Sequence, residues 1–325
     1  MNILITGITG QDGIFLTKYL LNNFNKVKIL GVSRSSKLDD FYLKSKISEN
    51  LLNSNQEIDV KNINLLSFDI VFSLIKDFKP KLIFNLSGPS SVYDSLKFPE
   101  QKKEIEKIFN NLTLACIENK VFPKFFQAST SEMYGLNNKE VIYSEDSNFI
   151  PNSPYSEGKL KNHNNVKLFH ETYDWNIYSG IMFNHESEFR KNNYLFMKII
   201  DNAYQIKNGI SSELILGSLD YVRDWSYAKD IAEGIFKITY EGKSFNYVLG
   251  SGKGNSIKEV VEKVFKIFDL NYQEYINVDN SLLRKNDPVE IISNPVKAYT
   301  DLKWKTDYGI NQIIEEIIKK RYSLI

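Results

Sequence analysis

The stretch NILITGITGQDG, residues 2–13, joins an apolar run to a glycine-rich turn and leads into the amphipathic segment FLTKYLLNNF. The apolar run is typical of a buried strand, and the amphipathic pattern is typical of a helix. Gly7, Gly10 and Gly13 would then let the chain turn tightly and bring a pyrophosphate close to the free N–H groups of the helix N-terminus. The stretch predicts a dinucleotide-binding turn, and a purely structural turn is the alternative.

The same alternation continues along the first half of the chain. Strand-like runs at VKILGV (27–32), KLIFNLSG (81–88) and KFFQAST (124–130) are separated by helical patterns at 65–78 and 100–119. Strands joined by helices of this length form right-handed crossovers and a parallel sheet. We therefore expect an α/β fold, a Rossmann-type doubly wound parallel sheet with a smaller mixed α/β substrate lobe toward the C-terminus.

The second half has looser spacing and no evident linker. A helix to about residue 171, a strand near 176–183, a helix near 194–209 and a strand at 213–217 precede a final helix with Ile313, Ile314, Ile317 and Ile318 on one face. We expect two lobes. The dinucleotide-binding domain would span 1–180 plus a returning segment near 213–250, and the substrate lobe would span about 181–212 and 251–325.

Composition limits the possible partners and compartment. The 41 Lys and Arg residues against 40 Asp and Glu residues give a formal net charge of +1, so no overall field would attract nucleic acid or an anionic membrane. We therefore expect neither partner. In addition, no run reaches the roughly 18 apolar residues of a membrane helix. The start MNILITG lacks the pattern of a signal peptide. The single Cys116 allows no intramolecular disulfide, is expected to be buried in a helix, and fits a cytoplasmic location.

Arg34 in GVSRSS follows the second predicted strand, where an NAD-specific enzyme commonly carries an acidic residue for the ribose 2′-hydroxyl. A guanidinium flanked by Ser35 and Ser36 suits a 2′-phosphate instead. This pattern favours NADP as cofactor. A solvated surface arginine is the alternative.

Tyr155 and Lys159 lie four residues apart in SPYSEGK (153–159), so both would face one side of a helix that begins near Pro154. A neighbouring ammonium would lower the pKa of the phenol and make it a competent proton carrier. The strand ending in QASTSEMYG carries Thr130 and Glu132 to the sheet edge where parallel sheets bind ligands, and Glu132 could remove a proton from carbon.

His163 and His170 show no metal-ligand spacing and are expected on a helix surface, so no metal site is predicted.

Together these motifs resemble the extended short-chain dehydrogenase/reductase family, and within it the GDP-mannose 4,6-dehydratases. The similar stretches are ITGITGQDG (5–13), KFFQASTSEMYG (124–135), NSPYSEGKL (152–160), IMFNHES (181–187) and LGSLDYVRDWSYAKD (216–230). FNHES and LDYVRDW are distinctive of these dehydratases, whereas the glycine turn and the tyrosine–lysine pair are shared more widely.

The resemblance implies three sets of site residues. The catalytic set is Thr130, Glu132, Tyr155 and Lys159. The cofactor set is Gly7, Gly10, Gln11, Asp12, Gly13, Arg34, Ser35, Asn64, Leu65, Leu86, Ser87, Tyr155, Lys159, His185 and Arg190. The substrate set is Ser90, Ser131, Asn184, Lys198, Arg223 and Arg284.

The resemblance also implies a reaction, in which GDP-mannose or a related GDP-sugar becomes the 4-keto-6-deoxy sugar by internal hydride transfer through bound NADP. A homodimer or homotetramer is expected. Ser156, Glu157 and Gly158 depart from the alanine-rich segment of the family. Two other functions stay open, an NADP-dependent 4-reductase or epimerase of a nucleotide sugar and a non-catalytic NADP-binding subunit.

Overall fold

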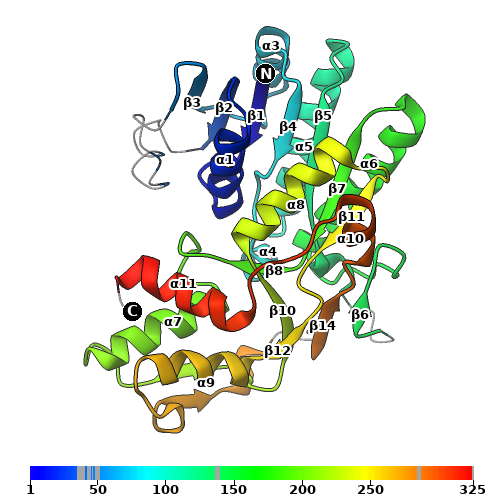
Figure 1. The fold of residues 1–325 in the computed structure, drawn as a ribbon. Helices are drawn as coiled ribbons and strands as arrows, with labels where there is room; N and C mark the ends of the chain where they lie inside the picture. Colours follow the sequence, from blue (N-terminus) through cyan, green and yellow to red (C-terminus); the bar gives the residue numbers. More distant parts are fainter. Residues whose placement is uncertain are drawn as a thin grey trace.

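A computed structural model describes residues 1–34, 41, 45, 47, 52–135, 140–283 and 287–323. Its largest element is a seven-stranded sheet in which every pairing is parallel and the strand order is β11-β7-β5-β4-β1-β2-β3 (Figure 1). The strands are β1 Asn2–Thr6, β2 Val27–Ser33, β3 Gln56–Asn62, β4 Leu82–Asn85, β5 Lys124–Thr130, β7 Ile177–Met182 and β11 Asn246–Leu249. The Rossmann-type parallel sheet predicted from the sequence is confirmed.

Helices cover both faces of this sheet because its strands are apolar on both sides. Ile3 and Ile5 of β1 face one hydrophobic core, whereas Leu4 between them belongs to a second core. α1 (Gln11–Asn23) packs against α8 (Ala228–Glu241) on the first face, and α3 (Phe68–Phe78), α5 (Gln101–Glu118) and α6 (Pro154–Tyr173) form the layer on the other (Figure 1). The short α4 (Val92–Lys97) packs against α6.

The chain reverses its winding at β1. β2 and β3 lie on one side of β1, and β4, β5 and β7 follow on the other. In open parallel sheets, ligands bind beyond the carboxyl ends of the strands at such a switch point. The glycine turn after β1, the segment after β4 and the residues after β5 therefore meet at one edge of the sheet.

The remaining strands form two smaller sheets below this edge (Figure 1). β10 (Val222–Tyr227) is central and pairs with β8 (Asn184–Glu186), β12 (Gly254–Ser256) and β14 (Glu290–Ser293), and β14 pairs with β6 (Ile142–Tyr143). β9 (Leu214–Leu216) pairs with β13 (Ile276–Val278). The helices of this part are α7 Leu195–Lys207, α9 Ile257–Ile267 and α11 Ile310–Tyr322. α10 (Val296–Leu302) packs against α8 and β11 of the large sheet. The short 3-10 helices are η2 Ser131–Met133, which follows β5, η3 Tyr272–Glu274 and η4 Asn280–Leu282.

The helices and strands that the sequence predicted by residue range are present. The four isoleucines of the final helix are fully buried in α11, and Cys116 is buried in α5. Several other elements were not predicted by range, among them β3, although the alternation of polar and apolar residues in its sequence QEIDVKN is typical of a half-buried strand.

The segment near 213–250 is divided between the two parts of the fold. α8 and β11 return to the seven-stranded sheet, whereas β9 and β10 pair with strands of the smaller sheets. The exact division into a dinucleotide-binding domain and a substrate lobe stays a prediction. In the part of the chain described here, no helix is long and apolar enough to cross a membrane.

His163 was expected on a helix surface, and this expectation is wrong. Its imidazole is 3 % exposed between α6 and β7, where Nδ1 lies 2.7 Å from the hydroxyl of Ser179. Ser179 in turn donates to Ser129 at 2.8 Å. Burial lowers the pKa of His163 to about 4, so the ring is neutral in the folded protein at neutral pH. His170, half-buried at the end of the same helix, lies 3.1 Å from the carbonyl oxygen of Trp175.

The buried His163 should make stability depend on pH. Below about pH 6.5 the unfolded chain binds a proton that the folded chain excludes, so stability falls as the pH drops toward about 4. Between pH 6.5 and pH 5 we expect His163 to cost about 2 kcal/mol of unfolding free energy. Urea titrations of His163→Gln should show a correspondingly shallower pH dependence. His170→Gln is the matched control, and equal slopes for wild type and His163→Gln would contradict this interpretation.

Candidate active site

The turn between β1 and α1 leaves no room for side chains at two of its glycines. Gly7 has φ +74°, and a Cβ there would lie 2.8 Å from the carbonyl oxygen of Leu86. A Cβ at Gly13 would lie 2.6 Å from the carbonyl oxygen of Gly7. Gly10 is the N-cap of α1 and offers no side-chain cap, so the first N–H groups of the helix stay available for an anion. This cradle fits a dinucleotide pyrophosphate.

A buried polar network ties this helix end to the segment after β7. Asp12 Oδ1 lies 3.0 Å from His185 Nε2, and Gln11 donates to the backbone carbonyl of His185 at 2.9 Å. Ser187 donates to Gln11 Oε1 at 2.9 Å, and His185 Nδ1 lies 2.7 Å from the carbonyl oxygen of Phe183. The network brings together predicted cofactor residues that are more than 170 positions apart in the chain.

The electrostatics of the Asp12–His185 pair favour the charged form of each side chain. Burial alone would lower the pKa of His185, but the charge and the hydrogen bond of Asp12 hold this pKa above its usual value. Burial would likewise raise the pKa of Asp12, but His185 holds it below its usual value. The negative charge of Asp12 is thus compensated by a cation and does not repel an anion at the helix N-terminus.

The predicted catalytic residues lie together where β5 ends and α6 begins. Thr130 closes β5, and its hydroxyl oxygen accepts the backbone N–H of Glu132, the central residue of η2, at 3.3 Å. The Thr130 hydroxyl and the charge of Glu132 both act on the phenol of Tyr155. Lys159, one turn after Tyr155 on α6, has its ammonium 5.8 Å from the centre of the Tyr155 ring.

The electrostatics of Tyr155 differ from the expectation. Burial raises the pKa of the phenol well above its usual value, Thr130 lowers it, and the charge of Glu132 raises it further. Lys159 instead donates to the backbone carbonyl of Ala128 at 2.8 Å, and burial lowers the pKa of this lysine to about 8. In the protein by itself, Lys159 anchors α6 to β5 and is not a main influence on the phenol.

The three residues between Tyr155 and Lys159 have structural roles. Ser156 and Ser153 form a reciprocal capping box that starts α6, with Ser156 N donating to Ser153 Oγ at 3.2 Å. Glu157 forms an ion pair with Lys102 of α5 at 2.7 Å. A Cβ at Gly158 would lie 3.2 Å from the carbonyl oxygen of Lys102, so the glycine lets α6 approach α5 closely.

A second charged group lies beside Tyr155. Arg190 Nε is 3.2 Å from Glu186 Oε2, and the Arg190 guanidinium lies 3.7 Å from the centre of the Tyr194 ring. The Tyr194 hydroxyl lies 2.8 Å from Ser90 Oγ. Tyr194 thus links Arg190, a predicted cofactor residue, to Ser90, a predicted substrate residue. Sequence reasoning missed Tyr194, and only its position four residues after Arg190 could have suggested the contact.

The other predicted cofactor residues lie just after the ends of β2, β3 and β4. Ser87 donates to Asn85 Oδ1 at 3.0 Å, and Leu86 N donates to the carbonyl oxygen of Thr6 at 3.2 Å. Asn64 accepts the N–H of Leu66 at 3.0 Å, and the carbonyl of Leu65 accepts from Asn111 of α5 at 2.8 Å. Arg34 is exposed and forms an ion pair with Glu104. Ser35 lies outside the described residues.

The predicted substrate residues are spread over several elements. Arg223 of β10 is buried, donates to the carbonyl oxygens of Val222 and Val289, and pairs with Asp287 at 3.1 Å. Lys198 of α7 donates to the carbonyl oxygen of Ile215 at 2.7 Å. Asn184 begins β8, Ser131 is buried at the start of η2, and Arg284 lies outside the described residues. The structure brings Ser90 and Ser131 near the catalytic group, whereas Arg223 and Lys198 are held by protein partners.

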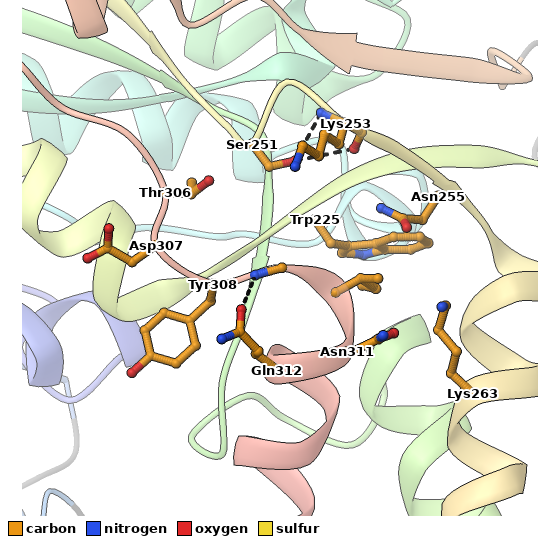
Figure 2. A pocket seen from close by; sticks show the side chains of 12 residues that line it. Trp225, Ser251, Lys253, Asn255, Lys263, Thr306, Asp307, Tyr308, Asn311 and Gln312 are labelled. Atoms are coloured by element: carbon orange, nitrogen blue, oxygen red, sulfur yellow. Dashed lines mark hydrogen bonds between the residues drawn. The ribbon is translucent and has the colours of Figure 1, made fainter.

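A separate pocket lies between the β11–β12 turn and the N-terminal end of α11 (Figure 2). Trp225 of β10, Lys263 of α9 and residues 306–312 line it. The four predicted catalytic side chains do not line this pocket. Among the described residues, no group of three or more His, Cys, Asp or Glu side chains is arranged to hold a metal ion.

The doubly wound sheet, the glycine turn and the Thr130, Tyr155 and Lys159 group define an extended short-chain dehydrogenase/reductase. The GDP-mannose 4,6 dehydratase family matches residues 4–317, and the chain belongs to this family.

Known proteins resemble the chain over nearly its whole length. GDP-mannose 4,6 dehydratase of Homo sapiens is 30% identical over 97% of this chain and 90% of its own length, and that of Dictyostelium discoideum is 28% identical over 98% and 94%. Among solved structures, dTDP-glucose 4,6-dehydratase from Bacillus anthracis in complex with NAD has a TM-score of 0.82 at 21% identity, covering 99% of this chain and 96% of its own. UDP-glucose 4-epimerase from Thermotoga maritima with UDP-glucose has a TM-score of 0.83 at 20% identity, covering 99% of both chains. At these identities the structures support the fold alone.

The close approach of Gly7 to the backbone of Leu86 should make the free energy of unfolding sensitive to substitution of Gly7. An alanine at φ +74° costs about 1–2 kcal/mol for the left-handed backbone, and its Cβ would in addition overlap the carbonyl of Leu86. Gly209→Ala is the matched control, because Gly209 has φ +68° and nothing within 4 Å of its Cβ position. We expect Gly7→Ala to lower the free energy of unfolding clearly more than Gly209→Ala in urea titrations. Equal losses would show that the contact with Leu86 does not matter.

Proposed function

We propose that this chain is a nucleotide-sugar 4,6-dehydratase that converts GDP-mannose, or a related GDP-sugar, to the 4-keto-6-deoxy sugar with bound NADP. The proposal is supported by Thr130, Glu132 and Tyr155 lying together, with the Thr130 hydroxyl and the Glu132 charge both acting on the Tyr155 phenol. Relatives named GDP-mannose 4,6 dehydratase cover nearly the whole chain and support the choice of substrate.

The residues present fit a dinucleotide cofactor. The glycine cradle and the N-terminus of α1 would hold its pyrophosphate, and Arg34 would hold an adenosine 2′-phosphate. Tyr155, Lys159 and Arg190 would line its nicotinamide end. When bound, the nicotinamide would supply a hydride acceptor for sugar C4 and a positive charge beside Tyr155 in its oxidised form, and a hydride donor for C6 in its reduced form.

Tyr155 would carry the proton of the sugar 4-hydroxyl. Burial favours the neutral phenol, so the phenolate needs positive charge and hydrogen bonds to form. The Thr130 hydroxyl and the nearby Arg190 charge both lower the pKa of Tyr155 and act in the required direction. Because Lys159 has a pKa of about 8, its charge is sensitive to pH near neutrality.

Glu132 would act on carbon. A 4-ketone acidifies the hydrogen at sugar C5, so a carboxylate that could not remove this proton from the parent sugar can remove it from the ketone. Loss of the 6-hydroxyl as water then follows, balanced by the proton that Tyr155 took from the 4-hydroxyl, and Glu132 would return the proton that it removed to C5 when C6 is reduced. A 4-reductase or epimerase needs no carbon base, so the role of Glu132 separates these functions.

Two variants test the reaction. Glu132→Gln should lower kcat for dehydration of GDP-mannose by a factor of at least about 100 with little change in KM, since it removes only the carbon base. Tyr155→Phe should abolish both oxidation and dehydration. Conversion is followed as loss of one water by mass spectrometry, with a panel of GDP-, CDP-, UDP- and dTDP-sugars as alternative substrates. Dehydration at the wild-type rate by Glu132→Gln would refute the proposed mechanism.

We further propose that the chain forms a homodimer or homotetramer and is cytoplasmic, since a single buried cysteine fits a reducing compartment. Large apolar side chains on the outer layer of α5, α6 and their adjoining turns support an assembly. Leu114 and Leu168 are 44% and 54% exposed, and the exposed rings of Phe122 and Tyr173 are stacked with centroids 6.5 Å apart. Such a patch is typical of a protein–protein interface.

A charged substitution tests whether this patch is the interface of the assembly. Leu168→Glu should shift the protein toward the monomer in analytical ultracentrifugation, because a carboxylate would be buried without a partner. Ile210→Glu, at an isoleucine that is 72% exposed elsewhere, is the matched control and should leave the assembly unchanged. An unchanged assembly in Leu168→Glu would place the interface elsewhere.

A further inference from the structure

We propose that Glu104 sets the choice between NADP and NAD by competing with the adenosine 2′-phosphate for Arg34. This inference rests on the proposed binding of a nicotinamide dinucleotide. It assigns a specificity role to a residue that no motif singles out.

The two residues come from different elements, the end of β2 and the first turn of α5. Arg34 directly follows β2, the position at which Rossmann folds recognise the ribose 2′ group. Its Nη1 lies 2.9 Å from Oε1 of Glu104, one turn into α5. The same helix reaches the predicted adenine segment, since Asn111 donates to the carbonyl of Leu65. Glu104 is therefore at the adenosine end of the cofactor site if Arg34 is.

The exposure of the pair shows that it can be broken. The Arg34 side chain is 76% exposed, whereas the Glu104 side chain is 23% exposed. Exposed ion pairs contribute little net stability, so the guanidinium can leave Glu104 for a phosphate. Glu104 is the less mobile partner, because its helix is fixed by the buried residues Ile105 and Ile108.

The carboxylate affects the two cofactors in opposite ways. A ribose 2′-hydroxyl can donate a hydrogen bond to Glu104, as it does to the acidic residue of NAD-specific Rossmann folds. A 2′-phosphate on Arg34 would instead lie beside a like charge and would have to displace an existing ion pair. Arg34 alone would bind NADP much more tightly than NAD. Glu104 reduces this difference in affinity, so that NAD also binds.

The test measures dissociation constants of NADP and NAD by fluorescence titration of the full-length protein. Glu104→Gln removes the charge but keeps a side-chain oxygen that can accept from a 2′-hydroxyl. We expect it to bind NADP about tenfold more tightly (~1.4 kcal/mol) and NAD within about threefold of wild type. Glu106→Gln is the matched control, because it removes the same charge from the same helix without a contact to Arg34. Adenosine 2′,5′-bisphosphate and ADP, as a second pair of probes, should show the same change without the nicotinamide.

Two outcomes would overturn the inference. An NADP-to-NAD affinity ratio that changes by less than about twofold, with both dinucleotides bound, would show that Glu104 does not discriminate. Weaker NADP binding by Glu104→Gln would show that Glu104 positions Arg34 for the phosphate and does not compete with it. A wild-type protein that binds neither dinucleotide would refute the proposed function itself, and this result is distinct from both.

Discussion

The hydrogen-bonded Asp12–His185 pair is the contact on which the site depends. It joins the first turn of α1 to the segment after β7, and through β8 and β10 it connects the parallel sheet to the smaller sheets. Gln11 reinforces the link through the backbone of His185 and the hydroxyl of Ser187. Because the pair is buried, loss of His185 would leave the Asp12 carboxylate without its hydrogen-bonded partner beside the pyrophosphate cradle.

The predicted catalytic residues are held in place by hydrogen bonds between side chains and the backbone. Lys159 donates to the carbonyl of Ala128 in β5, and the Ser153–Ser156 capping box fixes the start of α6 immediately around Tyr155. Thr130 and Glu132 follow β5 directly. The positions of Tyr155 and Glu132 are therefore set by the packing of α6 on β5. Gly158 lets α6 also approach α5 closely.

Sequence reasoning predicted which residues lie close together better than it described their surroundings. Tyr155 and Lys159 share one face of α6 as their spacing predicts, but burial, Thr130 and Glu132 determine the electrostatics of the phenol, and Lys159 bonds to the backbone. His163 was placed on the surface because a polar residue in a polar helix gives no sign of burial. Its hydroxyl partner, Ser179, lies on another element.

The sequence by itself determined the parallel sheet, the glycine turn and the spacing of Tyr155 and Lys159, because each depends on residues close together in the chain. Only the tertiary structure decided the contacts between distant segments. Asp12 with His185, Tyr194 with Ser90 and Arg34 with Glu104 are such pairs, separated by 173, 104 and 70 positions. A local pattern cannot reveal such partners, because the packing of whole helices and strands brings them within hydrogen-bonding distance.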